Sequence, residues 1–96
     1  MLDRQAVLDR LSASAEELHG LGARSLALFG SFAREEAREG SDVDLLVDLD
    51  RHTFDRYMDL KIWLEDLLGR RVDLVLIENL KPRIRDQILS EAIRAA

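Results

Sequence analysis

The residues in this chain that are best suited to chemistry are two aspartates separated by a single residue, Asp42 and Asp44. They belong to a run in which carboxylate and aliphatic side chains alternate, a pattern that indicates a half-buried strand with successive side chains on opposite faces. Both carboxylates then share one face of the strand, and the other face carries Val43, Leu45 and Val47. Two carboxylates side by side repel each other unless a cation lies between them. A divalent metal ion with hard oxygen ligands is the usual cation in such a position.

A Gly-Ser pair, Gly30 and Ser31, precedes Asp42, with ten residues in between. The apolar residues 26–29 before the pair predict a strand, and residues 32–36 after it predict a short helix. A strand that ends in Gly-Ser at the start of a helix presents free backbone N–H groups and a hydroxyl, which suit a phosphate group. A phosphate-binding turn beside a metal-binding strand is what phosphoryl or nucleotidyl transfer requires.

The hydrophobic pattern of the whole chain predicts an α/β fold, in which a small mixed β-sheet has helices packed on one face and the site on the other. Thr53 or Asp50 is expected to cap the helix over residues 54–68, and Gly69 to end it. Pro82 suits the first turn of the last helix. Helices are expected over residues 2–21, 31–37, 54–68 and 82–93, and strands over residues 25–29, 42–49 and 71–77.

The last of these strands carries a third acidic residue, Asp73, between aliphatic neighbours. If the aliphatic faces of both strands pack on the helices, Asp73 lies on the same sheet face as Asp42 and Asp44. Divalent cations that bridge to nucleotide phosphates would neutralise the three charges. The alternative for Asp73 is an isolated polar residue on a strand. Asp48 and Asp50, toward the end of strand 42–49, are expected to be solvated.

The spacing of the Gly-Ser pair and the two aspartates resembles the signature of the DNA polymerase β-like nucleotidyltransferase superfamily. In this chain, ten residues separate Gly30-Ser31 from Asp42-x-Asp44. The similarity is greatest to its small prokaryotic branch, the minimal nucleotidyltransferase (MNT) domains, and the order of elements agrees over nearly the whole chain. The resemblance implies the polymerase β-like fold, with ATP as the substrate. It also implies that Gly30 and Ser31 hold the triphosphate and that Asp42 and Asp44 coordinate two Mg²⁺ ions. Asp73 matches the third carboxylate of the family, which ligates the second ion or accepts the proton of the attacking hydroxyl.

Two residues that follow the Gly-Ser pair bear on nucleotide binding. Arg34 is interpreted either as a further contact to the triphosphate or as an exposed residue of the short helix. Glu35 stands where the family commonly has glycine, so this chain departs from the family pattern at that position.

Composition limits the classes of function that are open to the chain. Its 96 residues predict a single domain over residues 1–96. A net charge of −5 without a dense Lys/Arg cluster argues against direct binding of nucleic acid. The absence of cysteine excludes disulfides and thiolate metal sites. No apolar run reaches membrane-spanning length and the first ten residues lack a signal-peptide core, so a cytoplasmic location without a membrane partner is expected.

The expected catalytic core takes up nearly all of the 96 residues, so another protein is expected to present the acceptor. The helices over residues 54–68 and 82–93 also carry more apolar surface than a three-stranded core covers, which favours a protein partner. MNT domains commonly act as antitoxins of HEPN-family ribonuclease toxins, and the resemblance implies transfer of AMP from ATP to a tyrosine hydroxyl of such a toxin.

Two alternatives stay open. One is a binding-only antitoxin that blocks the toxin sterically, against which the intact set of three acidic residues argues. The other is a stand-alone nucleotidyltransferase for a small molecule or an RNA end, against which the short length and acidic balance argue.

Overall fold

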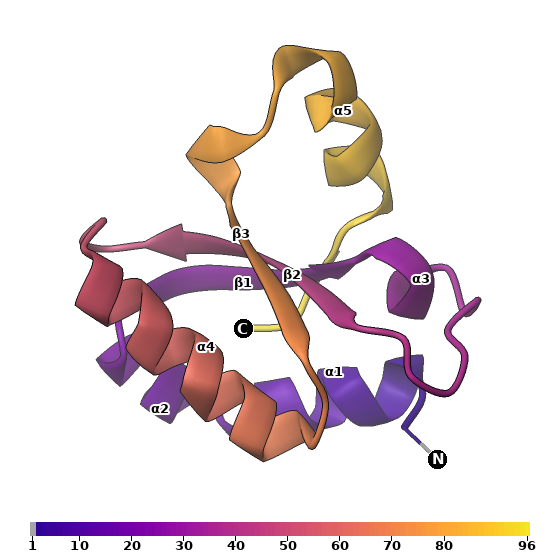
Figure 1. Ribbon diagram of the computed structural model, residues 1–96, viewed down its shortest axis with the longest axis horizontal. Helices are drawn as coiled ribbons and strands as arrows, with labels where there is room; N and C mark the ends of the chain where they lie inside the picture. Colours follow the sequence, from indigo (N-terminus) through magenta and orange to yellow (C-terminus); the bar gives the residue numbers. More distant parts are fainter. Residues whose placement is uncertain (1) are drawn as a thin grey trace.

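The computed structural model describes residues 2–96, in which four strands form one mixed sheet (Figure 1). The strand order is β3-β2-β1-β4; β2 and β3 are parallel, and β1 is antiparallel to both β2 and β4. The predicted fold class, a small mixed sheet with packed helices, is therefore confirmed. In chain order the elements are α1 (Arg4–Ala13), α2 (Ala15–Gly20), β1 (Ala23–Phe29), α3 (Gly30–Ala33), β2 (Val43–Leu49), α4 (Phe54–Leu68), β3 (Val72–Leu76), the 3-10 turn η1 (Ile77–Asn79), α5 (Pro82–Glu91) and β4 (Ile93–Arg94).

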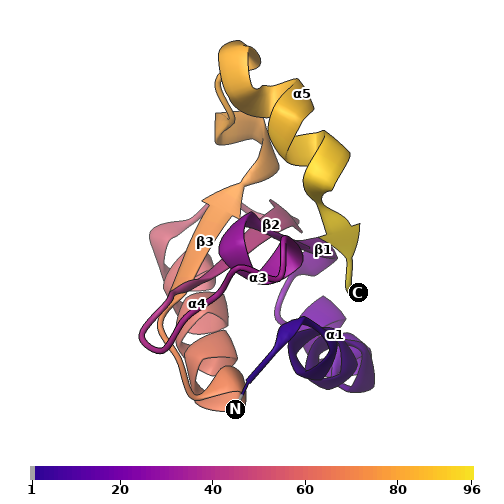
Figure 2. The ribbon, with the colours of Figure 1, turned by 90° about the vertical axis from the view of Figure 1, so that its right-hand side faces the viewer.

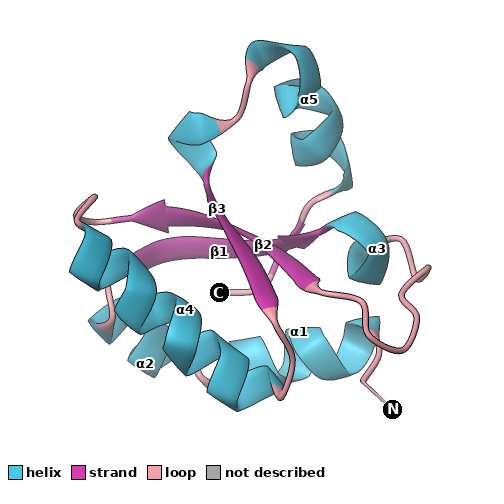
Figure 3. Ribbon diagram, viewed as in Figure 1, coloured by secondary structure: helices cyan, strands magenta, loops and turns pink. Residues whose placement is uncertain are grey.

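The hydrophobic core lies between one face of the sheet and the helices α1, α2 and α4, which are grouped together on that side (Figure 3). The strand register places Leu28, Leu45 and Leu74 side by side on this face, as the alternation in the sequence predicted. Burying one such leucine stabilises the fold by about 1.5–3 kcal/mol, so this face provides most of the stability. The helices contribute buried residues at helical spacing: Val7, Leu11, Leu18, Leu60, Leu64 and Leu68.

Helix α4 begins and ends at the residues that the sequence predicted. Thr53 Oγ1 accepts a hydrogen bond from the Arg56 N–H at 3.2 Å, which caps the first turn. Gly69 closes the last turn with a φ of 66°, a left-handed conformation that glycine adopts without strain. Phe54 and Ile62, on the outer side of α4, are 68% and 51% exposed. The apolar surface that was expected on this helix is therefore present at these two residues.

The predicted helix over residues 2–21 is wrong in one respect, because it is broken at Ser14 into α1 and α2. Ser14 has φ −108° and ψ 19°, outside the helical range, and its N–H donates to the Leu11 carbonyl at 3.1 Å. Serine favours helix ends over helix interiors because its side chain competes for backbone hydrogen bonds. The chain therefore changes direction here, and Leu18 of α2 is buried in the core.

The end of the chain also differs from the prediction, because the last helix stops at Glu91 instead of residue 93. Ala92 is extended, with ψ 138°, and the next residues form the short strand β4 beside β1. The Ala95 N–H donates to the Leu26 carbonyl at 2.8 Å, so β4 and the residue after it satisfy backbone groups along the free edge of β1. Helix α3 ends at Ala33, whereas a helix over residues 31–37 was expected. Strand β2 begins at Val43 instead of residue 42, so Asp42 lies in the loop before the strand.

The expectation that the helices pack on one face is wrong for α5, because the segment from η1 to α5 partly covers the other face of the sheet. Leu46 of β2 and Leu80 after η1 are buried, with 1% and 8% exposure, and β2 packs against η1. No residue of α5, which the structure describes completely, is buried, and the helix stands away from the sheet on the side opposite α1 and α4 (Figure 2). Within residues 2–96, none of the helices has both the length and the apolar content to span a bilayer.

Candidate active site

Asp44 and Asp73 lie next to each other on the sheet face that is turned away from the main core. The register pairs Phe29 of β1 with Asp44 of β2, and Asp44 with Asp73 of β3, so the three residues form one row across the sheet. Because side chains in one row of a sheet point to the same face, the two carboxylates are neighbours. The prediction that Asp73 shares a face with Asp44 is therefore confirmed.

The surroundings of Asp44 oppose ionisation of its carboxyl group. Burial raises the pKa of the Asp44 carboxyl to about 6, and the charges of Asp73 and Asp42 act in the same direction. A hydrogen bond between the Asp44 and Asp73 carboxyl groups also contributes to this rise, and the positive charge of Arg34 opposes it. A carboxyl group with a raised pKa is a better proton acceptor near neutral pH than an ordinary aspartate.

The Gly30 turn packs directly against Asp44. Gly30 has a φ of 73°, a conformation that favours glycine, and a Cβ atom built on it would lie 2.8 Å from Cγ of Asp44. Only a residue without a side chain fits between the end of β1 and this carboxyl group. Ser31 follows as a half-buried residue of the single turn α3, and its carbonyl accepts from the Glu36 N–H at 2.8 Å. The structure thus brings the Gly-Ser pair and Asp44 together.

Asp42 is not gathered with the other two aspartates. It is exposed in the loop before β2, and its Oδ1 lies 3.2 Å from Nε of Arg71 in an ion pair. Within residues 2–96, no three His, Cys, Asp or Glu side chains are arranged to hold a metal ion. The separation depends on a weak contact, because an ion pair between exposed side chains contributes only about 0–1 kcal/mol. Breaking this ion pair would therefore cost little.

The donor set nevertheless fits a hard divalent cation. Asp42, Asp44 and Asp73 offer only carboxylate oxygens, the ligand type that Mg²⁺ prefers. Burial, followed by the charges of Asp73 and Asp42, raises the pKa of Asp44 even with Arg34 nearby, so the folded protein opposes ionisation of this group. A cation bound between the aspartates would favour the ionised form instead.

Arg34 is exposed, and it pairs with Glu91, an acid that no sequence pattern marks as its partner. Its Nη1 lies 3.2 Å from Oε1 of Glu91, the last residue of α5. The same Oε1 accepts a hydrogen bond from the Gly30 N–H at 3.3 Å. Glu91 looks like any polar position of a terminal amphipathic helix, so no local signal could have placed it beside the Gly-Ser turn.

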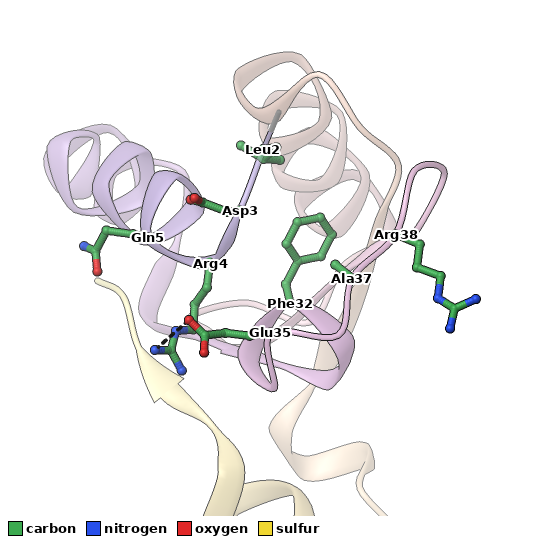
Figure 4. A pocket seen from close by; sticks show the side chains of 8 residues that line it. All are labelled: Leu2, Asp3, Arg4, Gln5, Phe32, Glu35, Ala37 and Arg38. Atoms are coloured by element: carbon green, nitrogen blue, oxygen red, sulfur yellow. Dashed lines mark ion pairs between the residues drawn. The ribbon is translucent and has the colours of Figure 1, made fainter.

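Glu35 points away from this site and toward α1. Its φ of 59° is the left-handed conformation in which glycine is unstrained, which explains why glycine suits this position. Its carboxylate pairs with Arg4 at 3.1 Å beside a cavity of about 190 Å³ (Figure 4). The cavity is also lined by Leu2 and Phe32, on the side of α3 away from Glu91. The departure from the family pattern therefore lies outside the candidate site.

Of the two acids expected to be solvated, Asp50 is instead held by a neighbour. Its carboxylate accepts hydrogen bonds from Nε and Nη2 of Arg56 at 3.2 and 3.0 Å, and this pairing keeps the pKa of Asp50 below its usual range. Asp48 is half-buried and faces Ser25 across the sheet. Neither acid joins the row that contains Asp44.

Known proteins are similar to this chain over nearly its whole length. A protein named protein adenylyltransferase MntA, from Thermococcus cleftensis, is 40% identical over 95 residues, which is 97% of this chain and 96% of that protein. A solved structure described as a candidate minimal nucleotidyltransferase is 44% identical, with a TM-score of 0.83. This match covers 96% of this chain and 95% of the chain in that structure.

A more distant structure shares the fold alone. It is a complex of a tri-AMPylated HEPN toxin from Shewanella oneidensis with an MNT antitoxin, at 18% identity and a TM-score of 0.65 over 93% of this chain and 71% of the matched chain. Residues 8–95 match the family described as the nucleotidyltransferase domain, and this segment contains both the Gly-Ser turn and the aspartate row. With this match and the similarity to MntA, the chain belongs to the nucleotidyltransferase domain family.

Proposed function

We propose that this protein is a Mg²⁺-dependent nucleotidyltransferase antitoxin, which transfers AMP from ATP to a tyrosine hydroxyl of a HEPN-family toxin and thereby inactivates it. The observation that carries the proposal is the packing of the Gly30 turn against Asp44, in the same row as Asp73. A phosphate-binding turn and a pair of neighbouring carboxylates are then in direct contact. The choice of AMP and of a toxin acceptor is supported by the relatives, one named a protein adenylyltransferase and one a complex with an AMPylated toxin.

In the proposed reaction, Gly30, Ser31 and Arg34 bind the triphosphate of ATP through a backbone N–H, a hydroxyl and a guanidinium group. Asp44 and Asp73, joined by Asp42 after it leaves Arg71, would hold Mg²⁺. The metal supplies charge neutralisation at the phosphate oxygens and at the attacking oxygen.

The bond changes are those of a single displacement. The tyrosine oxygen forms a bond to the α-phosphorus, the bond from that phosphorus to the bridging oxygen breaks, and pyrophosphate leaves. Asp73 accepts the proton of the hydroxyl in this scheme, since its carboxylate is exposed and can be reached by an acceptor. A phenol suits the reaction, because its pKa of about 10 makes it easier to deprotonate than an alkyl alcohol.

Transfer to a toxin would also explain inhibition. A nucleotide linked through phosphate adds negative charge and bulk to the toxin surface. If the modified tyrosine lies near the ribonuclease site, the added charge opposes binding of the RNA phosphates. In this scheme the complex with the toxin holds the acceptor tyrosine in place.

The test is intact-mass spectrometry of the HEPN-type protein encoded beside this one, after incubation with ATP and Mg²⁺. The wild type should add one or more AMP groups to a tyrosine, and Asp42→Ala/Asp44→Ala should add none. Asp48→Asn, which alters an acid of the same strand outside the row, should act as the wild type does. If the mass is unchanged while the ribonuclease is still suppressed, the binding-only antitoxin is the correct reading. The ion pair of Asp42 with Arg71, which keeps that acid from the row, is the observation in its favour.

A further inference from the structure

Helix α5 is linked to the candidate active site by one carboxylate. Oε1 of Glu91 accepts a hydrogen bond from the Gly30 N–H at 3.3 Å and lies 3.2 Å from Nη1 of Arg34, and Oε2 lies 3.5 Å from the same nitrogen. The Glu91 side chain is only 24% exposed, although α5 is otherwise solvated. Glu91 therefore sits on the donors to which the triphosphate of ATP is assigned above.

Helix α5 itself makes few contacts with the body of the protein, although the chain is anchored on either side of it by Leu80 and by β4. The helix has no buried residue, and its apolar side chains Ile84 and Leu89 are 45% and 40% exposed. The figures show it on the far side of the sheet from the core helices, with its C-terminal end near α3 (Figure 2). Within residues 2–96, Glu91 is the one side chain of α5 that forms a hydrogen bond or ion pair outside the helix. Glu91 is therefore the side-chain contact that ties α5 itself to the candidate site.

We propose that Glu91 is an internal competitor for the nucleotide, which sets the affinity of the site for triphosphate and releases the end of α5 when ATP binds. This inference rests on the proposed function, since it assumes that Gly30 and Arg34 bind phosphate. A carboxylate and a phosphate oxygen accept the same charge-assisted hydrogen bonds from a backbone N–H and a guanidinium group. One N–H cannot serve both acceptors at full strength, so the phosphate displaces the carboxylate. The apparent dissociation constant equals the intrinsic one divided by the fraction of molecules in which Glu91 leaves the donors free.

The variant Glu91→Gln tests this competition. Glutamine keeps the size of the side chain and one neutral acceptor but removes the negative charge. Because the contact is partly exposed to solvent, Glu91→Gln should bind ATP about threefold to tenfold more tightly than the wild type does. The matched control is Glu36→Gln. Glu36 lies 3.5 Å from Nε of Arg34 but does not contact Gly30, so its variant should bind within about twofold of the wild type. Titration calorimetry with ATP, and with inorganic tripolyphosphate as a probe of the phosphate site, gives these constants with and without Mg²⁺.

Hydrogen exchange provides a readout that does not depend on activity. Adding ATP to the wild type should speed exchange of the backbone amides of residues 86–92, and Glu91→Gln should show the faster exchange without ATP. Equal or weaker binding by Glu91→Gln, or protection of α5 that ATP leaves unchanged, would overturn the inference while leaving nucleotide binding intact. If neither protein binds ATP or tripolyphosphate, the proposed function fails and the inference fails with it.

Discussion

Replacing Asp44 by asparagine should stabilise this protein at neutral pH, although it removes a residue of the candidate active site. Burial, together with the charges of Asp73 and Asp42, raises the pKa of Asp44 to about 6, against about 3.9 for an aspartate in an unfolded chain. Between these values the folded protein binds more protons than the unfolded chain does. Stability from this group is therefore complete below about pH 4 and is lost as the pH rises through about 6.

The magnitude follows from the size of the shift. Two pKa units correspond to about 3 kcal/mol, and because Asp44 is partly in contact with solvent a discounted value of about 1 kcal/mol is appropriate. Asp44→Asn should therefore raise the free energy of unfolding by about 1 kcal/mol at pH 8, which is a rise of about 4–8 °C in Tm for a protein of this size. At pH 4, where the wild-type carboxyl is protonated, the gain should disappear.

The assay is urea unfolding of the wild type and the variant at pH 4, 5, 6, 7 and 8, with the difference in unfolding free energy plotted against pH. Taking the difference removes the contributions of other acids. Asp48→Asn is the control, since Asp48 lies on the same strand and faces Ser25 instead of a second acid, and it should give a flat difference. Mg²⁺ should stabilise the wild type at pH 8 more than it stabilises Asp44→Asn. A variant that is destabilised equally at pH 4 and pH 8 would refute the account of the carboxylate pair.

Three further predictions concern the surroundings of the site. Gly30→Ala should destabilise the protein by more than Gly40→Ala, because both have positive φ, whereas only at Gly30 does the added Cβ meet other atoms; thermal unfolding compares the two. Glu35→Gly should change the free energy of unfolding by less than about 1 kcal/mol, because relief of left-handed strain offsets the lost ion pair, and nucleotide binding measured by calorimetry should be unchanged. Asp50→Asn should lower Tm at pH 7 and have little effect at pH 3, because the hydrogen bonds from Arg56 lower the pKa of Asp50 and their stabilisation is lost as the pH falls through the folded value.

The row that contains Asp44 and Asp73 could be predicted because strands leave few choices. Side chains alternate with a period of two, and aliphatic residues that must enter the core fix which face each strand turns inward. Leu45 and Leu74 are paired in the core, so the preceding residues are paired on the other face. The pairing of β2 with β3 then sets the two carboxylates side by side. The same reasoning could not exclude an ion pair for Asp42, because that residue lies in the loop and is free of the alternation.

The parts that could not be predicted depend on contacts between distant segments. Glu91 and Gly30 are 61 residues apart in the chain, and nothing in the helical pattern around Glu91 marks it as a partner of that turn. Strand β4 was expected to be helical because Ile93 continues an amphipathic period, and the free edge of β1 overrode this preference. The break at Ser14 has a different cause. The preference of a single serine for a helix end is too weak to predict a break, although it decides the direction of the chain here.

The position of the carboxylate pair bears on the choice between an enzyme and a steric antitoxin. Asp44 lies against Gly30, whose positive φ and lack of a side chain leave room for the carboxyl group, so the local backbone is shaped around the acid. The pair lowers stability at neutral pH, because the raised pKa of Asp44 means that ionisation is opposed in the folded state. A protein that only blocks its partner gains nothing from such a pair, whereas a metal-dependent transferase needs it to attract a cation. The opposed ionisation of Asp44 therefore supports the proposed transferase over the steric antitoxin.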